Sequence, residues 1–172
     1  MTKETASQPI PLPFELVTLV ARELTLRDGG HEPTLIIDGS SGPAVVQIDA
    51  LAPRFGARIE QMFFAGAALA GEGHIGRLRQ VFFIAEGWVS TAQDGSPPHS
   101  RPSQDPNRKE VLIISGYAPA TGQANLALLE MIRDPDGTLR ELREFERFRD
   151  DEEDVRSPLL MAFVKGFFSR TN

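Results

Sequence analysis

The stretch RQVFFIAEGWVS, residues 79–90, carries the strongest strand signal in the chain. It is rich in β-branched and aromatic residues, which are enriched in strands. A second run of the same kind, EVLIISGYA at residues 110–118, follows a long polar segment. We predict that these two runs are the central strands of one antiparallel sheet.

A proline-rich segment separates the two strands. SPPHSRPSQDPNRKE, residues 96–110, has a composition that disfavours any regular element. Long irregular connections are uncommon in compact domains and are usually functional loops or disordered segments. We predict an extended proline-rich loop at residues 91–109, and the sequence leaves open whether this loop is ordered.

This loop is a candidate binding element. Its prolines restrict the unfolded chain, so ordering the loop against a partner costs less conformational entropy. A mobile surface excursion without a ligand is the alternative. The candidate binding residues in and beside the loop are Trp88, Pro97, Pro98, His99, Arg101 and Arg108.

Further strands are predicted on both sides of this centre. Upstream, PTLIID from Pro33 and AVVQID from Ala44 are separated by GSSGP, a turn-forming cluster that suits a hairpin. Downstream, ANLALLEMIRD leads into the turn sequence DPDG at residues 134–137. Residues 138–148 fit either a helix or a strand, because their apolar residues lie three apart, and we favour a strand that completes the meander.

Three helices are predicted beside the sheet. Leucine and valine residues at three- and four-residue spacing predict an amphipathic helix that ends at Gly29. The segment RIEQMFFAGAALAG from Arg58 predicts a helix whose small residues let it lie close to a sheet. Ser157 and Pro158 begin a last helix that should pack on the sheet. The apolar stripes of the first and last helices are Leu16, Leu19, Val20 and Leu24, and Leu160, Phe163, Val164 and Phe167.

Together these elements predict one α+β domain that spans residues 1–172. Their order is α-β-β-α-β-β-β-(β)-α, and the short connections favour hairpins over parallel crossovers. We therefore expect a single, mostly antiparallel sheet packed against helices. Residues 1–12 are expected to be frayed.

The composition indicates a soluble, acidic protein. At 172 residues and 41% hydrophobic content, the chain can bury one sizeable core. It has no cysteine, which excludes disulfides and thiolate-bound zinc, and no apolar run approaches the roughly 20 residues of a membrane helix. The first residues lack the apolar core of a signal peptide, so we expect a cytoplasmic protein. A net charge of −6 disfavours binding to nucleic acid, and we predict no membrane partner.

Motifs for cofactors and metals are weak. GEGHIG at residues 71–76 has the glycine spacing of a dinucleotide site, but it leaves a helix and enters a strand, which reverses the required order. His31, His74 and His99 are too far apart in sequence to form a metal-binding pair on one element. The acidic run DDEED at residues 150–154 lacks the ligand pattern of a calcium loop. We predict no cofactor and no metal.

Two acidic residues interrupt apolar strand faces. By strand alternation Glu86 shares a face with Ile84 and Trp88, and Glu130 shares one with Leu128. A carboxylate among apolar side chains has a raised pKa, and two such groups across a pocket could divide acid and base roles. The alternative is that these faces meet solvent, or that an arginine such as Arg77, Arg79 or Arg133 pairs with each acid.

One part of the chain resembles a known group of proteins. EGWVS, followed by RPSQDPNRKEVLIIS and then by a strand ending in RDPDG, resembles uncharacterised bacterial and phage-associated proteins. These proteins carry a tryptophan strand, a P-S-x-D-P-x-R-x-E-like segment and a further strand. The resemblance covers residues 79–137 and implies a shape without an activity.

Two functional interpretations follow from the sequence. The first is a non-enzymatic bacterial accessory domain that acts through a protein partner or self-association. The alternative is a small enzyme or ligand-binding domain that uses Glu86 and Glu130 in a pocket between the sheet and the helices.

Overall fold

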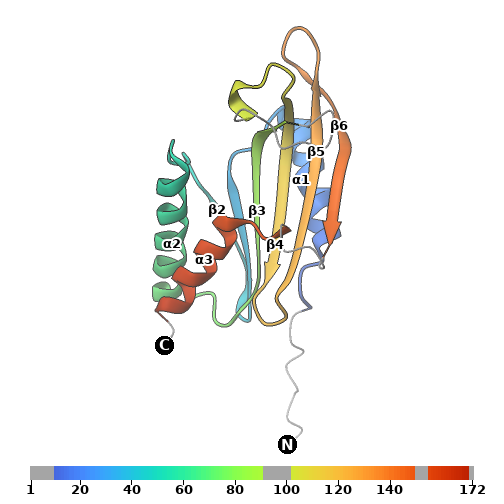
Figure 1. Ribbon diagram of the computed structural model, residues 1–172. Helices are drawn as coiled ribbons and strands as arrows, with labels where there is room; N and C mark the ends of the chain where they lie inside the picture. The colour runs from blue at the N-terminus through green and yellow to red at the C-terminus, as the bar shows by residue number, and fades with distance from the viewer. Residues whose placement is uncertain (1–9, 91–101, 150–154, 171–172) are drawn as a thin grey trace, which may run out of the picture.

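The computed structural model describes residues 10–90, 102–149 and 155–170 (Figure 1). Within these ranges lie three α-helices, α1 (Phe14–Asp28), α2 (Phe55–Glu72) and α3 (Pro158–Ser169), and one short 3-10 helix, η1 (Pro102–Gln104). The strands are β1 (Thr34–Gly39), β2 (Gly42–Gln47), β3 (Leu78–Val89), β4 (Lys109–Ala118), β5 (Gln123–Arg133) and β6 (Leu139–Arg149). The α+β class and the order of elements predicted from the sequence are confirmed.

All six strands form one antiparallel sheet with the order β2-β1-β3-β4-β5-β6. The two runs predicted as central are β3 and β4, which pair from Val81 and Tyr117 to Val89 and Lys109. The ambiguous residues 138–148 lie almost entirely in β6, so the strand interpretation is confirmed.

Short turns join most neighbouring strands. The predicted turn at residues 134–137 is confirmed, because the Gly137 N–H donates to the Asp134 carbonyl at 2.9 Å and Gly137 has a φ of 87°. The β1–β2 turn is tighter than predicted, since Gly39 pairs directly with Gly42. In the proline-rich loop, the one turn of η1 interrupts a segment for which no regular element was expected.

Helix α1 packs on one face of the sheet, which we call the α1 face (Figure 1). Phe14, Val17 and Ala21 are buried there against Ile84, Leu129 and other apolar strand residues. The apolar stripe that the sequence identified on this helix, Leu16, Leu19, Val20 and Leu24, is exposed and does not pack on the sheet. Both sides of the helix carry apolar residues, and the side with Phe14, Val17 and Ala21 packs on the strands.

Helices α2 and α3 lie on the opposite face, which we call the α3 face (Figure 1). Leu160, Phe163 and Phe167 of α3 are buried with Val81 and Phe83 of β3, as predicted for the last helix. Ser157 caps α3 by accepting a hydrogen bond from the Leu160 N–H at 3.5 Å.

The small residues of α2 meet α3 instead of the sheet. A Cβ placed on Gly66 would lie 2.1 Å from the Phe163 carbonyl oxygen, and one on Gly166 would lie 1.9 Å from the Phe63 carbonyl oxygen. The two helix backbones therefore cross in direct contact. The small residues of α2 allow the expected close approach, but they approach α3 and not the sheet.

The segment before α1 is attached to the sheet. The Leu12 N–H donates to Asp38 at 3.0 Å, and the Leu12 carbonyl accepts from Gln80 at 3.1 Å. Asp38 is buried and also forms an ion pair with Arg79. Leu12, which was expected to belong to a frayed end, is thus held by two strands.

Candidate functional site

The two acids predicted as a pair lie on opposite faces of the sheet. Glu86 pairs with Leu112 in the β3–β4 ladder, and Leu112 pairs with Leu129. Residues directly opposite in antiparallel strands share a face, so Glu86 lies on the α1 face. Glu130 pairs with Val111, the neighbour of Leu112, and therefore lies on the α3 face. The structure does not bring the two carboxylates into one pocket, which corrects the predicted acid–base site.

Glu130 is part of an ion pair at the end of the sheet. Its carboxylate lies 3.1 Å from Lys109 Nζ, and the same ammonium group lies 5.1 Å from the centroid of the Phe145 ring. Lys109 begins β4 and Glu130 is near the end of β5, so the contact joins two strands. A partly exposed pair of this kind contributes up to about 1 kcal/mol to stability.

Glu86 holds the loop that follows α1. Its Oε1 accepts a hydrogen bond from the backbone N–H of His31 at 2.6 Å. The same oxygen would lie 3.0 Å from a Cβ on Gly30, so the loop passes directly over the carboxylate. Glu86 therefore has a local structural role.

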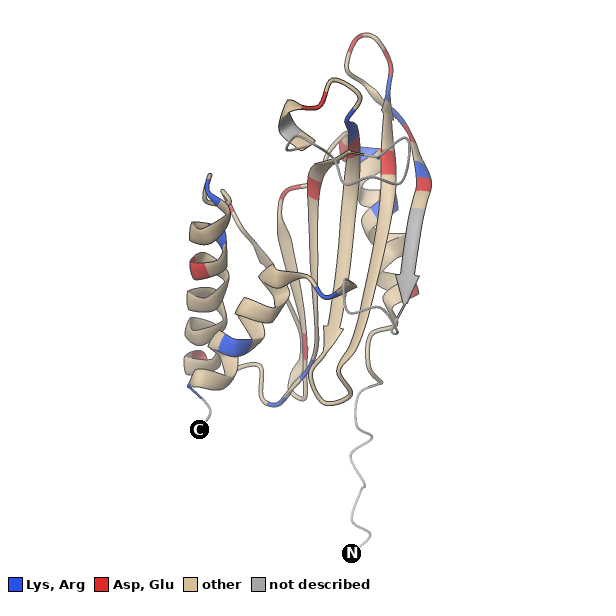
Figure 2. Ribbon diagram, in the orientation of Figure 1, with Lys and Arg blue, Asp and Glu red and all other residues tan. Residues whose placement is uncertain are grey.

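Arg133, which the sequence offered as a partner for Glu86 or Glu130, binds a third acid. Two of its nitrogens donate to the two oxygens of Glu110, each at 2.9 Å, and it also donates to the Gly29 carbonyl at 2.9 Å. The bond to Glu110 raises the pKa of Arg133. These contacts fix the carboxyl end of α1 to the sheet, where the charged residues of the strands gather (Figure 2).

In its neutral form His31 is held as a single tautomer. The Thr25 hydroxyl donates its only proton to the Ala21 carbonyl at 2.7 Å, so its 3.2 Å contact with His31 Nδ1 requires the imidazole proton on Nδ1. His31 Nε2 is then a lone-pair acceptor, and it is buried without a partner among the described residues. Burial lowers the pKa of His31, and the nearby carboxylates of Glu86, Asp28 and Glu32 oppose this shift only in part.

Stability should therefore fall as the pH drops below about 6.5, the ordinary pKa of histidine. The pKa of His31 is lower in the folded state than in the unfolded chain, so the unfolded chain takes up the proton first as the pH falls. The free energy of unfolding therefore decreases until the pH has passed the folded-state pKa. We expect His31→Gln to reduce the loss measured by urea unfolding at pH 7.5 and 5.5. The matched change at exposed His74 should leave the loss intact, and an equal loss in both variants would contradict this account.

One end of β3 extends beyond its neighbour. β1 pairs with β3 only as far as Thr34 and Ile84, whereas β4 follows β3 to Val89 on the other side. Before Thr34 the chain passes onto the α1 face, where His31 contacts Glu86. No described strand lies beside residues 85–89 on this side, which we call the open edge of β3.

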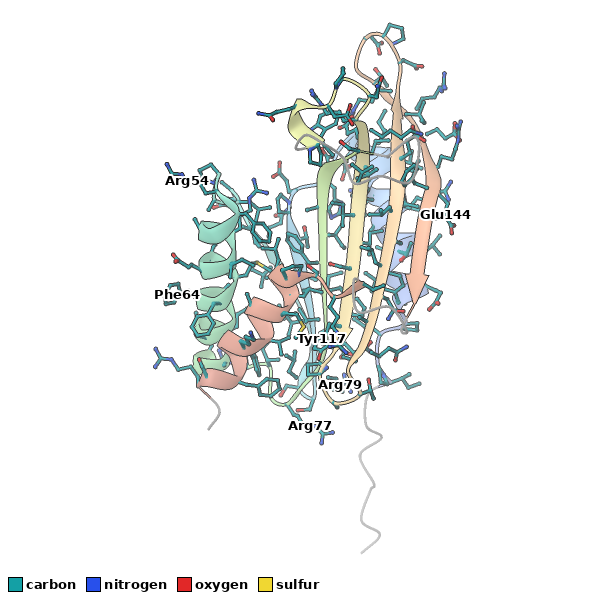
Figure 3. All side chains as sticks on the ribbon, viewed as in Figure 1. Arg54, Phe64, Arg77, Arg79, Tyr117 and Glu144 are labelled. Carbon is teal, nitrogen blue, oxygen red and sulfur yellow. The ribbon has the colours of Figure 1, made fainter. Side chains whose placement is uncertain are left out.

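A cleft of about 1240 Å³, here named the β3 cleft, lies at the open edge. Two of its aromatic side chains are strongly exposed, Phe55 at 60% and Trp88 at 46%. Arg54 and Arg58 extend from the first residues of α2, and Figure 3 shows Arg54 at that end of the helix. The lining residues are Pro53, Arg54, Phe55, Arg58, Glu86, Gly87, Trp88, Pro102 and Glu110.

Two of the predicted binding residues meet at this cleft. The Arg108 guanidinium carbon lies 4.5 Å from the centroid of the Trp88 ring, which is a cation–π contact. Nearby, the Asn107 N–H donates to Asp105 at 2.8 Å, and this bond lowers the pKa of Asp105 and holds a turn. The other predicted binding residues, Pro97, Pro98, His99 and Arg101, lie outside the described residues, so their role stays a prediction.

The residues of α2 in the cleft were not predicted from the sequence. Phe55 and Arg58 are far from Trp88 in the chain, and no local pattern links them. Arg58 is placed by its Nε–H, which donates to the Ala52 carbonyl at 2.6 Å. Only the fold brings this wall of the cleft to the open edge.

The described residues contain neither a metal cluster nor a nucleotide loop. No three histidine, aspartate or glutamate side chains among them come close enough to hold a metal ion. Gly73 ends α2 and Gly76 precedes β3, both in left-handed conformations with φ of 72° and 68°. GEGHIG is thus a helix-to-strand turn. Within the same part of the chain, no helix combines the length and apolarity needed to cross a membrane.

Comparisons with protein families, with curated proteins and with solved structures found no match.

Proposed function

We propose that this protein is a binding domain that takes up an extended polypeptide segment in the β3 cleft. The open edge of β3 is the observation that carries this proposal. In an antiparallel sheet, alternate residues of a strand direct their N–H and C=O groups to each side. An added strand from a partner would satisfy the backbone groups at residues 85–89, as in other cases of β-strand addition.

The outer edges of the sheet are less suited to such pairing. The edge strand β6 carries charged residues along its whole sequence, LRELREFERFR, and the six-residue edge strand β2 contains Pro43. Charge, proline and short length are the usual features that prevent pairing at an edge. The open edge of β3 instead contains Gly87 and the exposed Trp88, with Glu86 as its only charge.

The side chains of the cleft define the kind of segment that would bind. Phe55 and Trp88 provide apolar surface for an aromatic or aliphatic anchor. Glu86 accepts from the His31 N–H and Glu110 binds Arg133, so both acids are engaged within the protein. Arg54 and Arg58 make no ion pair with a described residue. We therefore expect an extended segment that combines an apolar residue with an acidic one.

The enzymatic alternative has less support. It requires Glu86 and Glu130 in one pocket, and the strand register places them on opposite faces. No other observation on the described residues favours a reaction.

Trp88→Ala should weaken peptide binding by about 30-fold or more, because a central aromatic anchor contributes about 2 kcal/mol or more. The probe is a peptide selected from a displayed library of short random sequences on the immobilised wild-type protein. We expect the selected peptides to contain an acidic and an apolar residue. Fluorescence anisotropy measures the affinity of each peptide for the wild type and the variants.

Phe64→Ala is the matched control, since Figure 3 shows Phe64 on α2 pointing away from the sheet. This variant should bind the selected peptide as the wild type does. Arg58→Gln should weaken the binding of those selected peptides that need their acidic residue to bind the wild type. The proposal is wrong if selection yields no binder, or if Trp88→Ala and Phe64→Ala bind equally well.

A further inference from the structure

A second cavity, of about 920 Å³, lies on the α1 face between α1 and the strands β1, β2 and β3. Helix α1 packs against residues of β3 to β6, such as Phe82, Leu129 and Leu142, and leaves the same face of β1 and β2 without a helix over it in the described chain. We call this cavity the α1 hollow. Its volume is within the range of small-molecule sites, about 300–1000 Å³.

The walls of the α1 hollow are apolar. Val20 and Leu24 of α1 line one side, and Ile36 and Val45, which pair directly across β1 and β2, line the other. Ile84 of β3 is buried between them, and Val45 is 67% exposed. These side chains offer apolar surface that a ligand could remove from water.

The charges that line the α1 hollow are mostly negative. One arginine, Arg27, stands against three acids, Asp28, Glu32 and Glu86, which gives a net charge of −2. Arg27 donates to both oxygens of Asp28, at 2.7 and 2.8 Å, so these two charges offset each other. Glu32 and Glu86 form no ion pair with a described residue. Burial lowers the pKa of His31, so the imidazole adds no positive charge at neutral pH.

Glu86 places a negative charge at one end of the apolar walls. Its Oε1 accepts from the His31 N–H at 2.6 Å, which leaves its charge in place and its Oε2 available. Glu86 and Ile84 lie on the same face of β3, two residues apart. Ile36 pairs with Phe82, so Glu86 is four residues further along, or about 13 Å. The acidic end and the apolar walls are therefore continuous.

We propose that the α1 hollow binds a small organic cation that consists of an ammonium group on an apolar chain. The ammonium group donates to Glu86 and lies near Glu32, and the chain covers Ile84 and extends toward Ile36 and Val45. The negative lining selects the charge of the ligand, since an anion of the same shape would be repelled. This site does not depend on peptide binding at the β3 cleft.

Three probes with the same apolar chain test the ligand class. Octylammonium, octanol and octanoate are titrated into the protein, and binding is followed by the chemical shifts of the His31 and Val45 amides. Octylammonium should bind about tenfold or more tightly than octanol, because a hydrogen bond to a charged group adds to the same apolar contact. Octanoate should bind most weakly.

Charge changes at Val45 test the location. Val45 is exposed on an edge strand, so both Val45→Lys and Val45→Glu should keep the fold. Val45→Lys should weaken octylammonium binding by about tenfold, whereas the matched Val45→Glu should bind at least as tightly as the wild type. Glu32→Gln should also weaken binding, without removing the contact between Glu86 and His31.

The proposal is overturned if octylammonium does not bind at millimolar concentration, or if octanol binds equally well. Equal binding by Val45→Lys and Val45→Glu would also overturn it. A peptide selected on the β3 cleft should bind Val45→Lys as it binds the wild type. Loss of octylammonium binding with retained peptide binding therefore counts against the α1 hollow alone, and the reverse result counts against the β3 cleft alone.

Discussion

Gly66→Ala should destabilise the protein by about 3 kcal/mol, the upper part of the usual cost of overpacking. The new Cβ would lie 2.1 Å from the Phe163 carbonyl oxygen and 2.9 Å from the Phe167 nitrogen. Both are backbone atoms, so no side-chain rotation can relieve the clash and the two helices must separate. Urea unfolding followed by circular dichroism measures the loss.

Gly71→Ala provides the matched control in the same helix. A Cβ on Gly71 meets nothing within 4 Å, so this change should stabilise the protein by up to about 1 kcal/mol through helix propensity. The two substitutions are chemically identical and differ only in what lies across from them. If Gly66→Ala were as stable as Gly71→Ala, the close crossing of α2 and α3 would be disproved.

Phe163→Ala should cost about 3–5 kcal/mol, the range for removing a fully buried aromatic side chain. Phe163 is 0% exposed and packs between the sheet and α2, with its ring centroid 6.4 Å from that of Phe167. Its loss would leave a cavity at the centre of the α3 face. The midpoint of urea unfolding should shift strongly with little change in the slope.

Phe64→Ala removes the same side chain from an exposed position on α2. Its edge contact with Phe63 limits the expected loss to about 1 kcal/mol. Similar losses in the two variants would mean that Phe163 is not a core residue.

Strand pairing was predictable because the signals are local. Each hairpin combines β-rich runs with turn residues, as at Asp134 and Gly137, and short connections exclude parallel crossovers. Ser157 and Pro158 likewise mark the start of α3 through capping, which depends on few neighbouring residues.

The orientation of α1 was not predictable from spacing. Periodicity shows that residues share a side of a helix, and it does not show which side meets the sheet. Leu16 and Leu19 form one apolar stripe, yet Val17 and Ala21 pack on the strands. Phe14, the largest apolar residue of the helix, packs on the same side as Val17 and Ala21, and the local sequence contains no signal that selects this side.

Strand register decides whether Glu86 and Glu130 lie on the same face of the sheet. A shift of one residue moves every side chain to the other face, and the long connection between β3 and β4 does not set the register. The open edge of β3 also depends on tertiary structure, because it exists only where the chain before Thr34 leaves the sheet.

Hydrogen exchange of the backbone amides at residues 85–89 tests the proposed function most directly. With a selected peptide bound, amides on the open edge of β3 should exchange more slowly, because they would donate to the added strand. The amides of the outer edge strand β6 should be unchanged and serve as the internal control. Slower exchange at residues 85–89 is the predicted result, and tight peptide binding without any protection there would contradict it.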